Sequence, residues 1–403
     1  MKRVLVAILA VALFLGLATG FDLLLRLSYL IALILALSFA WAQANVRWLT
    51  VSVERNRERA QVGDSLVERI GVSSTGLLPK LWVRAATSSD LPGHAPALVA
   101  SLPSRAARSL RVTTRLRRRG RYTLGPIIVD SGDPFGLFRS ARVFGDARHL
   151  IVYPATVPLP GFRVPPADIV GDGRQRRRTF QVTANAAGVR DYSYGDSYNR
   201  IHWPSTARMG KLMVKEFELD PSGEVWVLLD LEAGSQAGCD EESTQEYGVT
   251  IAASVMKRYL DAGRVAGLII YGLERQVLST HAGEAQLMKA LEALALARPG
   301  PRPLSEALAT ESFRLNRRST LVVITPCATD HWVGQLAEVR RRGVAVAVVA
   351  LEPSTFGGSQ NSLLVVSGLL SNDIPAYLVK RGDDLSRALT YSGASELRRV
   401  RLE

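Results

Sequence analysis

Two long apolar runs at the N-terminus constrain this chain more than any other feature of its sequence. Residues 4–20 contain no charged side chain, and residues 27–44 form a second such run with Trp41 near its end. At 1.5 Å per residue, the first run reaches about 26 Å as a helix, close to the thickness of a bilayer core. Because polar backbone cannot end inside lipid, the connection between the runs must emerge on the far side. Residues 1–45 are therefore predicted to form a transmembrane helical hairpin.

Positive charge flanks the two apolar runs unevenly. Lys2 and Arg3 precede the first run, four arginines lie within residues 47–59, and the short connection has only Arg26. The positive-inside bias therefore predicts a multi-pass protein of the cell membrane with its globular domains on the cytoplasmic side. A rival interpretation treats residues 1–20 as a cleaved signal peptide. In that case the second run would stop transfer and still leave the remainder cytoplasmic.

The region 46–160 alternates short β-favouring runs with turn residues such as Gly63-Asp64 and Pro92-Gly93. No long helical period interrupts it, so the pattern predicts an antiparallel β-sandwich of immunoglobulin-like type. The predicted strands cover residues 48–53, 66–72, 81–86, 110–116, 121–129 and 150–153.

The net charge of +13 is concentrated in two arginine clusters, one within residues 105–121 and one within residues 174–178. Such a local field suits anionic lipid, nucleic acid or an acidic partner. In residues 110–117 apolar side chains alternate with arginines, which predicts a half-buried strand with one basic face. Binding of single-stranded nucleic acid would need aromatic platforms among the basic residues, and only Tyr122 lies nearby. Nucleic acid is therefore not expected as a partner.

Residues 161–223 are predicted to be a linker and a dense segment of polar, charged and aromatic side chains. Gly195-Asp196 predicts a turn, with Asp196 capping the helical turn that follows. Pro204 predicts the start of a second helical piece, and residues 212–217 resemble a strand. Arginine pairs bidentately with carboxylates and stacks on aromatic rings, so the segment is interpreted as a structural lock or a docking surface.

A catalytic interpretation of the same segment would use His202 as a base beside Asp196. It lacks a nucleophile and an oxyanion-binding group, so catalysis is not expected.

The dense segment matches a known signature at Gly188, Arg190, Tyr192, Gly195, Asp196, Arg200, Ile201, Trp203, Ala207 and Arg208. Further motifs of the same family occur at residues 118–122, 124–126, 133–138 and 152–154. In these residues, and in the order of its regions, the chain resembles the bacterial domain-of-unknown-function family 58. The resemblance implies no established activity. It implies a membrane-anchored partner of MoxR-type AAA+ ATPases and a C-terminal domain like the von Willebrand factor type A fold.

Residues 224–403 alternate predicted strands with predicted helices. This pattern predicts a doubly wound α/β sheet, with ligands at the carboxyl ends of its strands. The strands are expected at residues 224–231, 265–271, 320–325, 344–351 and 376–379. The helices are expected at residues 241–260, 283–297, 331–342 and 383–389.

The von Willebrand type A fold usually binds a divalent cation through Asp-x-Ser-x-Ser, a Thr and an Asp from three loops. Here Asp230 remains, but neither serine follows it, and Glu232 stands where the first serine would be. Arg302 falls near the position of the threonine, and Thr325-Pro326 takes the place of a Ser-Asp pair. The hypothesis is that Arg302 neutralises the two acids in place of a cation, so no metal and no cofactor is expected.

Isolated histidines and cysteines add no further site. His94, His149, His281 and His331 lack metal-ligand spacing and are interpreted as surface or core histidines. The chain has only two cysteines, too far apart for a CxxC motif, and no Walker sequence, so an ATPase would have to be a separate protein.

The sequence thus predicts a non-enzymatic assembly or adaptor protein at the cytoplasmic membrane. Its predicted parts are a hairpin at residues 1–45, a β-sandwich at 46–160, the signature segment at 161–223 and an α/β domain at 224–403. The expected docking residues are Arg190, Tyr192, Gly195, Asp196, Arg200, Trp203 and Arg208. The alternative, from another class, is a magnesium-dependent module that binds a protein ligand.

Overall fold

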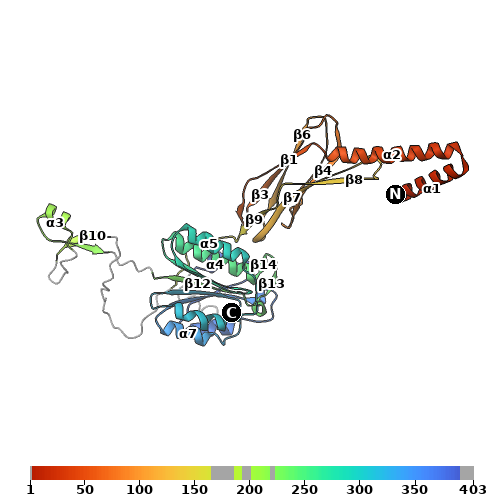
Figure 1. Cartoon of the computed structure of the whole chain (residues 1–403). Helices are drawn as coiled ribbons and strands as arrows, with labels where there is room; N and C mark the ends of the chain where they lie inside the picture. Colours follow the sequence, from red (N-terminus) through yellow and green to blue (C-terminus); the bar gives the residue numbers. More distant parts are fainter. Residues whose placement is uncertain (1, 165–185, 193–200, 218–222, 391–403) are drawn as a thin grey trace. The chain divides into compact units, whose positions relative to one another are not determined.

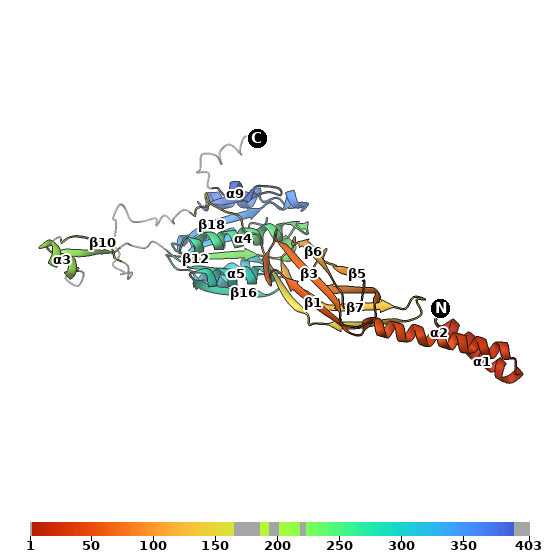
Figure 2. The same ribbon diagram turned by 90° about the horizontal axis from the view of Figure 1, so that it is seen from above.

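The computed structural model describes residues 2–164, 186–192, 201–217 and 223–390 (Figures 1 and 2). The chain divides into two compact units, residues 1–155 with 291–296 and residues 156–290 with 297–403. The fold is a mixture of α and β with two N-terminal apolar helices and several sheets, as the sequence predicts.

Two antiparallel helices open the first unit. Helix α1 spans Lys2–Thr19 and helix α2 spans Asp22–Val46, and both are long and apolar enough to cross a membrane. Gly20 has φ +67° at the turn between them, a conformation that glycine adopts without strain. Most side chains of both helices are exposed, but Ala42, Asn45 and Val46 at the end of α2 are buried. The last turn of α2 is therefore part of the folded body that follows it.

Two β-sheets form the rest of the first unit. One has the order β1-β3-β6 and is antiparallel; the other has the order β2-β9-β7-β4-β5, with β8 paired to β7. The strands are β1 (Leu49–Arg55), β2 (Arg59–Gln61), β3 (Ser65–Ser74), β4 (Lys80–Ser89), β5 (Ala97–Leu102), β6 (Ala107–Arg115), β7 (Gly120–Gly132), β8 (Arg139–Phe144) and β9 (Arg148–Tyr153). All six strands predicted from the sequence are present, and β2, β5 and β8 are additional. Since β2 and β9 are parallel, the region is not wholly antiparallel.

The arginine-rich strand β6 has the predicted half-buried character. Thr114 is buried on its inner side, while Arg111 and Arg115 point to solvent.

A six-stranded sheet with the order β16-β15-β12-β17-β18-β19 forms the core of the second unit. All neighbouring strands are parallel except β16, which is antiparallel to β15. The strands are β12 (Val225–Asp230), β15 (Ala266–Tyr271), β16 (Arg275–His281), β17 (Thr320–Thr325), β18 (Ala345–Leu351) and β19 (Ala376–Val379). The sequence predicts every one of them except β16.

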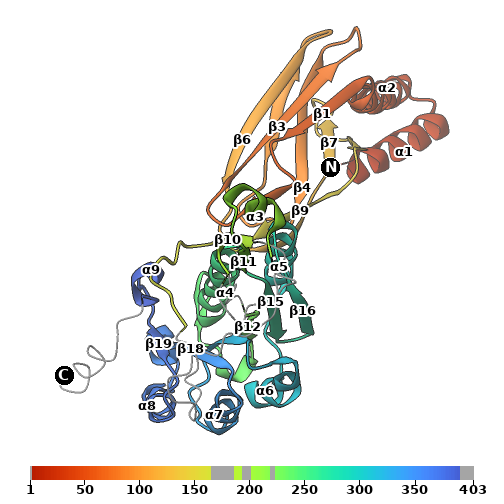
Figure 3. The same ribbon diagram turned by 90° about the vertical axis from the view of Figure 1, so that its left-hand side faces the viewer.

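Helices cover both faces of this sheet (Figure 3). Helices α4 (Thr244–Asp261) and α5 (Glu284–Leu296) lie on one face, and α6 (Leu304–Glu311), α7 (Val333–Arg341) and α8 (Leu363–Ser371) lie on the other. Strands β12, β15 and β17 are buried at every residue because both faces are covered. Gly248 on α4 is close enough to Leu229 that an added Cβ would lie 3.3 Å from it. A last short helix, α9 (Leu385–Ala388), follows β19.

The segment that follows β9 packs on the second unit. The backbone N–H of Val157 donates to Ser254 on α4 (2.9 Å), and the ring of Phe162 lies 5.1 Å from that of Tyr377 on β19. The predicted division at residue 160 thus lies a few residues beyond the point where the chain joins the second unit.

Candidate functional site

The carboxyl edge of the parallel sheet carries the predicted residue Asp230. It is the last residue of the central strand β12 and is only 1% exposed. Its Oδ2 accepts a hydrogen bond of 2.6 Å from the hydroxyl of Thr325, the last residue of β17. Its Oδ1 accepts a hydrogen bond of 2.9 Å from the backbone N–H of Glu232. Two predicted positions, Asp230 and Thr325, are therefore brought together because adjacent parallel strands end side by side.

Burial controls the electrostatics of this carboxyl group. It raises the pKa of Asp230 to about 6, because the charged form loses its hydration. The hydrogen bonds from Thr325 and from the Glu232 backbone oppose this rise, and the negative charge of Glu232 adds to it. At neutral pH Asp230 is thus an anion that is held only by neutral donors.

Arg302 does not neutralise Asp230 in the way the sequence suggests. It is half-buried and lies just before α6, and among the described residues no ion pair joins it to Asp230 or Glu232. Glu232 instead accepts from the hydroxyl of Ser235 (3.2 Å). Backbone bonds between Gly300 and Leu231 and between Gly300 and Ala233 (3.0 and 2.7 Å) hold this loop beside the loop that follows β12.

The described residues at this edge supply few ligands for a divalent cation. Magnesium prefers near-octahedral oxygen ligands, and each oxygen of Asp230 here accepts one hydrogen bond. The nearby buried Glu352, at the end of β18, is bonded to the hydroxyls of Ser362 and Ser354. Within the described ranges no group of three or more His, Cys, Asp or Glu side chains could hold a metal ion.

The signature segment forms a small β-hairpin with a helix in its connection. Strand β10 (Ala186–Asp191) pairs antiparallel with β11 (Met213–Phe217), and helix α3 (Trp203–Met209) lies between them in sequence. The helix begins at Trp203-Pro204, as the proline predicts, and β11 confirms the predicted strand at residues 212–217. Gly210, with φ +67°, ends the helix and donates from its N–H to Thr206 O (3.0 Å).

His202 caps α3. Its Nδ1 lies 2.7 Å from the hydroxyl of Ser205 and accepts from the Ser205 backbone N–H at 3.3 Å. The imidazole therefore has a structural role here. It accepts from the Ser205 backbone N–H, one of the N–H groups that have no partner within the first turn of a helix.

The signature residues fall into three groups in the structure. Arg190 lies on β10, where its backbone is in register with Val214, and Tyr192 directly follows that strand, its backbone N–H donating to Leu212 O (2.9 Å). Trp203 and Arg208 lie on α3 and are exposed. Gly195, Asp196 and Arg200 lie outside the described residues, and so does the predicted cap by Asp196. The docking role of these residues stays a prediction.

Helix α3 has an exposed apolar surface. The side chain of Trp203 is 65% exposed and that of Met209 is 64% exposed, while neighbouring Leu212 is 39% exposed. Tryptophan is enriched among residues that dominate protein–protein binding energy. The exposed side chain of Trp203 thus makes α3 a candidate contact surface.

The first unit contains a buried polar cluster around Glu68 that was not predicted from the sequence. Glu68 on β3 is fully buried; its Oε2 accepts from Arg55 Nε and His94 Nε2, both at 3.1 Å, and its Oε1 accepts from the hydroxyl of Thr87 at 2.7 Å. His94 Nδ1 in turn lies 2.8 Å from Thr114 Oγ1. Burial would raise the pKa of Glu68, but the hydrogen bonds from His94, Thr87 and Arg55 together with the charge of Arg55 lower it to about 2.

The signal for this cluster is present in the predicted strand 66–72. Leu66, Glu68, Ile70 and Val72 alternate onto one face, so Glu68 must share the inner face with three apolar side chains. In the structure Leu66 belongs to one apolar core of the sandwich and Ile70 to another, and the polar cluster lies between the two.

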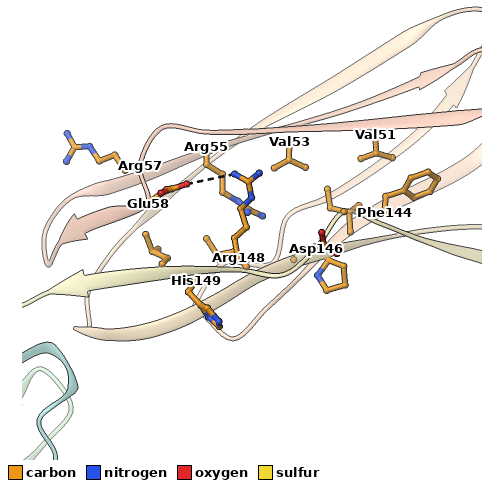
Figure 4. Close-up of a pocket in the computed structure, with 15 residues that line it drawn as sticks. Val51, Val53, Arg55, Arg57, Glu58, Phe144, Asp146, Arg148 and His149 are labelled. Atoms are coloured by element: carbon orange, nitrogen blue, oxygen red, sulfur yellow. Dashed lines mark ion pairs between the residues drawn. The ribbon is translucent and has the colours of Figure 1, made fainter. Parts of the chain in front are cut away.

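A cavity of about 250 Å³ opens between β1 and the residues around the start of β9 (Figure 4). Arg55, Arg57 and Arg148 line it together with Glu58 and Asp146, and Glu58 lies 3.9 Å from Arg148. The charges nearly balance, and no serine, threonine, cysteine or lysine lines the cavity. It therefore offers no nucleophile–base pair and no strong preference for an anion.

Together, these features define a class: a mixed α/β protein with two N-terminal apolar helices, whose signature hairpin exposes Trp203 and whose parallel sheet ends in the buried carboxylate of Asp230. Residues 188–355 match the family described as "Protein of unknown function DUF58". The matched region contains the signature segment, so the resemblance predicted from that segment is confirmed for residues 188–355.

A relative of known sequence and several solved structures are similar to parts of the chain. The "Uncharacterized protein YeaD" of Bacillus subtilis (strain 168) is 26% identical over 292 residues, which cover 70% of this chain and 69% of that protein. A CARDB domain from Pyrococcus furiosus covers 26% of this chain and 91% of its own, with 14% identity and a TM-score of 0.20. Proximal thread matrix protein 1 from the mussel byssus covers 42% of this chain and 45% of its own, with 13% identity and a TM-score of 0.32. These low scores carry no argument about fold or function.

Proposed function

We propose that this chain is a non-enzymatic assembly or adaptor protein, anchored in the cell membrane by α1 and α2. The anchor is fixed to the sandwich: Asn45 Nδ2 donates to Leu81 O (3.1 Å) and to Ser131 Oγ (3.2 Å), and the buried Lys80 donates to Ala44 O. These contacts hold α2 on the sandwich whether or not residues 1–20 are removed, so they support α2 as the lasting part of the anchor.

The globular parts lie on the cytoplasmic side in this proposal. The far end of the helix pair holds one basic residue, Arg26 in the first turns of α2, and it pairs with Asp22 at 2.5 Å. Lys2 and Arg3 at the other end of α1, and the arginines after α2, outnumber it. The charge bias therefore favours a multi-pass arrangement with both ends of the hairpin in the cytoplasm.

The α/β domain serves as a docking module of von Willebrand type A-like design without a metal. The order of its parallel strands and the position of Asp230 at the carboxyl edge support this assignment. The alternative is magnesium-dependent binding of a protein ligand. Calorimetry of the full chain in detergent discriminates them: we expect no heat of magnesium binding, whereas binding that disappears in Asp230→Ala would establish the alternative.

The partner is an AAA+ ATPase of MoxR type, a class taken from the family resemblance. The single observation that carries a docking role is the 65% exposed side chain of Trp203 on the signature helix. Arg190 and Asp196 of the same signature are proposed as docking residues from the sequence.

A pull-down of an AAA+ partner by the detergent-solubilised full chain tests the proposal. We expect Trp203→Ala to lose most of the captured partner while the chain stays folded, because truncation of a central aromatic typically removes more than about 2 kcal/mol of binding energy. Phe313→Ala is the matched control, since Phe313 is another exposed aromatic (84%) far from the signature in sequence. Equal capture by both variants would refute docking through α3, and loss of folding in Arg190→Ala would assign that residue to a structural lock.

A further inference from the structure

The turn that joins β7 to β8, residues 133–138, is rigid and apolar. The carboxylate of Asp133 accepts from the backbone N–H groups of Phe135 (3.0 Å) and Phe138 (2.6 Å), and the Asp133 N–H donates to Phe138 O (3.2 Å). Gly136, with φ +69°, completes the turn. Asp133 itself is 5% exposed, so its charge is enclosed by donors while Phe135, 63% exposed, points outward. We call residues 133–138 the hairpin tip.

The β7–β8 hairpin runs along α2 in the direction away from the sandwich (Figure 1). Three contacts follow one another along the helix. Asn45 bonds Ser131 at 3.2 Å, Gln43 Oε1 accepts from the hydroxyl of Ser140 at 3.2 Å, and the ring of Phe39 packs edge-on against Phe138 at 5.5 Å. The hairpin tip is therefore carried beyond Phe39, toward the middle of the apolar helix.

Beyond Phe39, the hairpin tip lies beside apolar side chains of both helices. Phe135 and Leu137 enclose a groove of about 360 Å³ together with Leu5, Ile8, Ile31 and Ile34. Ile31 lies eight residues from Phe39 along α2, which corresponds to about 12 Å at 1.5 Å per residue.

The positions of charged side chains show where an aqueous interface would cross this assembly. Lys2 Nζ lies 4.5 Å above the ring of Phe138, and Arg139 is exposed at the base of the tip. Both cations suit lipid headgroups. After Arg3, which adjoins Lys2, no charged residue follows along α1 until Asp22 at the far end of the helix pair. Phe135 and Leu137 thus lie on the apolar side of the Lys2–Arg139 level.

We propose that the hairpin tip is a third membrane-inserted element, which dips into the acyl-chain region beside α1 and α2. The inference rests on the proposed membrane anchor. The occupant of the groove between the tip and the helices is lipid acyl chains: every residue that lines it is apolar, and it is continuous with the apolar helix surfaces that the bilayer surrounds. In water, the exposed phenylalanine and this groove would extend an already large apolar patch.

A fluorescence experiment on the full chain tests this insertion. An environment-sensitive label is attached to a single introduced cysteine in a Cys239→Ser background, which leaves only the buried Cys327. The three labelled variants are Phe135→Cys at the tip, Ile34→Cys on α2 and Val143→Cys on β8. Val143 is the matched control, because it is 65% exposed on the same hairpin but lies toward the sandwich. Each is reconstituted into phosphatidylglycerol and phosphatidylethanolamine vesicles with nitroxide-labelled acyl chains.

We expect the Phe135 and Ile34 labels to lose most of their emission and the Val143 label to keep it. Quenching at Ile34 without quenching at Phe135 overturns the insertion of the tip and leaves the membrane anchor intact. Absence of quenching at Ile34 overturns both the anchor and the inference.

Discussion

Glu68 and Asp230 are both fully buried carboxylates, but their surroundings drive their pKa values in opposite directions. Glu68 accepts hydrogen bonds from Arg55, His94 and Thr87, and its pKa falls to about 2. Asp230 accepts from a hydroxyl and a backbone N–H, and its pKa rises to about 6. Burial is the largest cause acting on both groups, so the difference comes from the partners.

The comparison shows that a buried acid is not by itself a sign of a functional site. The cluster around Glu68 connects strands β1, β3, β4 and β6 and the loop that carries His94, so it joins the two sheets through satisfied polar groups. Asp230 has no cationic partner among the described residues and sits where parallel sheets usually bind ligands. A strongly perturbed acid at such an edge is the better candidate for a role beyond stability.

The largest expected effect comes from removing the charge of Glu68. Glu68→Gln leaves the half-buried Arg55 and the buried His94 without a carboxylate partner, and breaking a buried pair costs about 3 to 5 kcal/mol. We expect the free energy of unfolding of the sandwich to fall by that amount, measured by urea-dependent hydrogen exchange of peptides from β3 and β6. Glu54→Gln, an exposed acid on β1, is the control and should change little. Equal effects of the two substitutions would show that the cluster does not stabilise the sandwich.

The contribution of Asp230 to the free energy of unfolding should depend on pH in the opposite direction to that of Glu68. Because its pKa is raised in the folded state, the folded chain holds the proton longer than the unfolded chain, and stability falls as the pH rises from about 4 to about 6. A pKa of about 6 against an ordinary 3.8 corresponds to about 3 kcal/mol.

Asp230→Asn should remove this dependence and be at least as stable as the native chain above pH 6. Hydrogen exchange of peptides from β12 and β17, corrected for intrinsic rates, measures it. A pH dependence that persists in the variant would mean that another group is responsible. Glu68 acts in the reverse sense, since its stabilising effect is lost only as the pH falls from about 4.5 toward 2.

A smaller effect is expected from Thr325→Val. The substitution removes the 2.6 Å hydrogen bond to Asp230 and leaves the Cys327 N–H without its acceptor. We expect a loss of about 2 kcal/mol from the α/β unit at neutral pH and a further rise in the pKa of Asp230. The midpoint of the pH-dependent stability should move upward relative to the native chain; a downward shift would contradict the assigned direction of the hydrogen bond.

The smallest effect is expected from Arg302→Gln. Since Arg302 makes no ion pair with Asp230 or Glu232 in the described structure, its removal should change the unfolding free energy by only about 0.5 kcal/mol. The pH profile of the α/β unit should stay unchanged. A clear upward shift of that profile would restore the hypothesis that Arg302 compensates the two acids.

The sequence predicts the buried parallel strands well and the edge elements poorly. Strand β17 begins and ends where its apolar run predicts, because a strand covered on both faces must be apolar throughout. Edge strand β19 is the exception among the edge elements, since its short apolar run predicts it correctly. Edge strand β16 is half polar and carries no such signal. Helix α8 is almost wholly apolar over nine residues, and a short apolar run does not distinguish helix from strand.

The sequence predicts those parts of the candidate site that the strand order brings together. It does not predict the hydrogen bonds and ion pairs that depend on the direction of individual side chains. Asp230 and Thr325 end adjacent predicted strands, so their proximity follows from a parallel sheet. The position of Arg302 in the loop before α6 places it near the same edge, but its side-chain direction is set by packing that the sequence does not reveal. The partners of Glu68 come from separate strands and a loop, so the sequence does not predict them. The alternation along β3 predicts only that the Glu68 side chain points inward.

The hydrogen bonds of Asn45 fix the rotation of α2 about its own axis relative to the sheets that follow. Only Arg47 and Trp48 separate α2 from β1, and the Asn45 amide joins the helix to β4 and β7. A helix joined in this way cannot swivel about its own axis without turning the sandwich. In a bilayer, thickness and packing set the tilt of a helix pair. In the proposed membrane anchor, lipid composition would therefore set the direction in which the sandwich points, and the bilayer would exert a mechanical influence on the folded sheets.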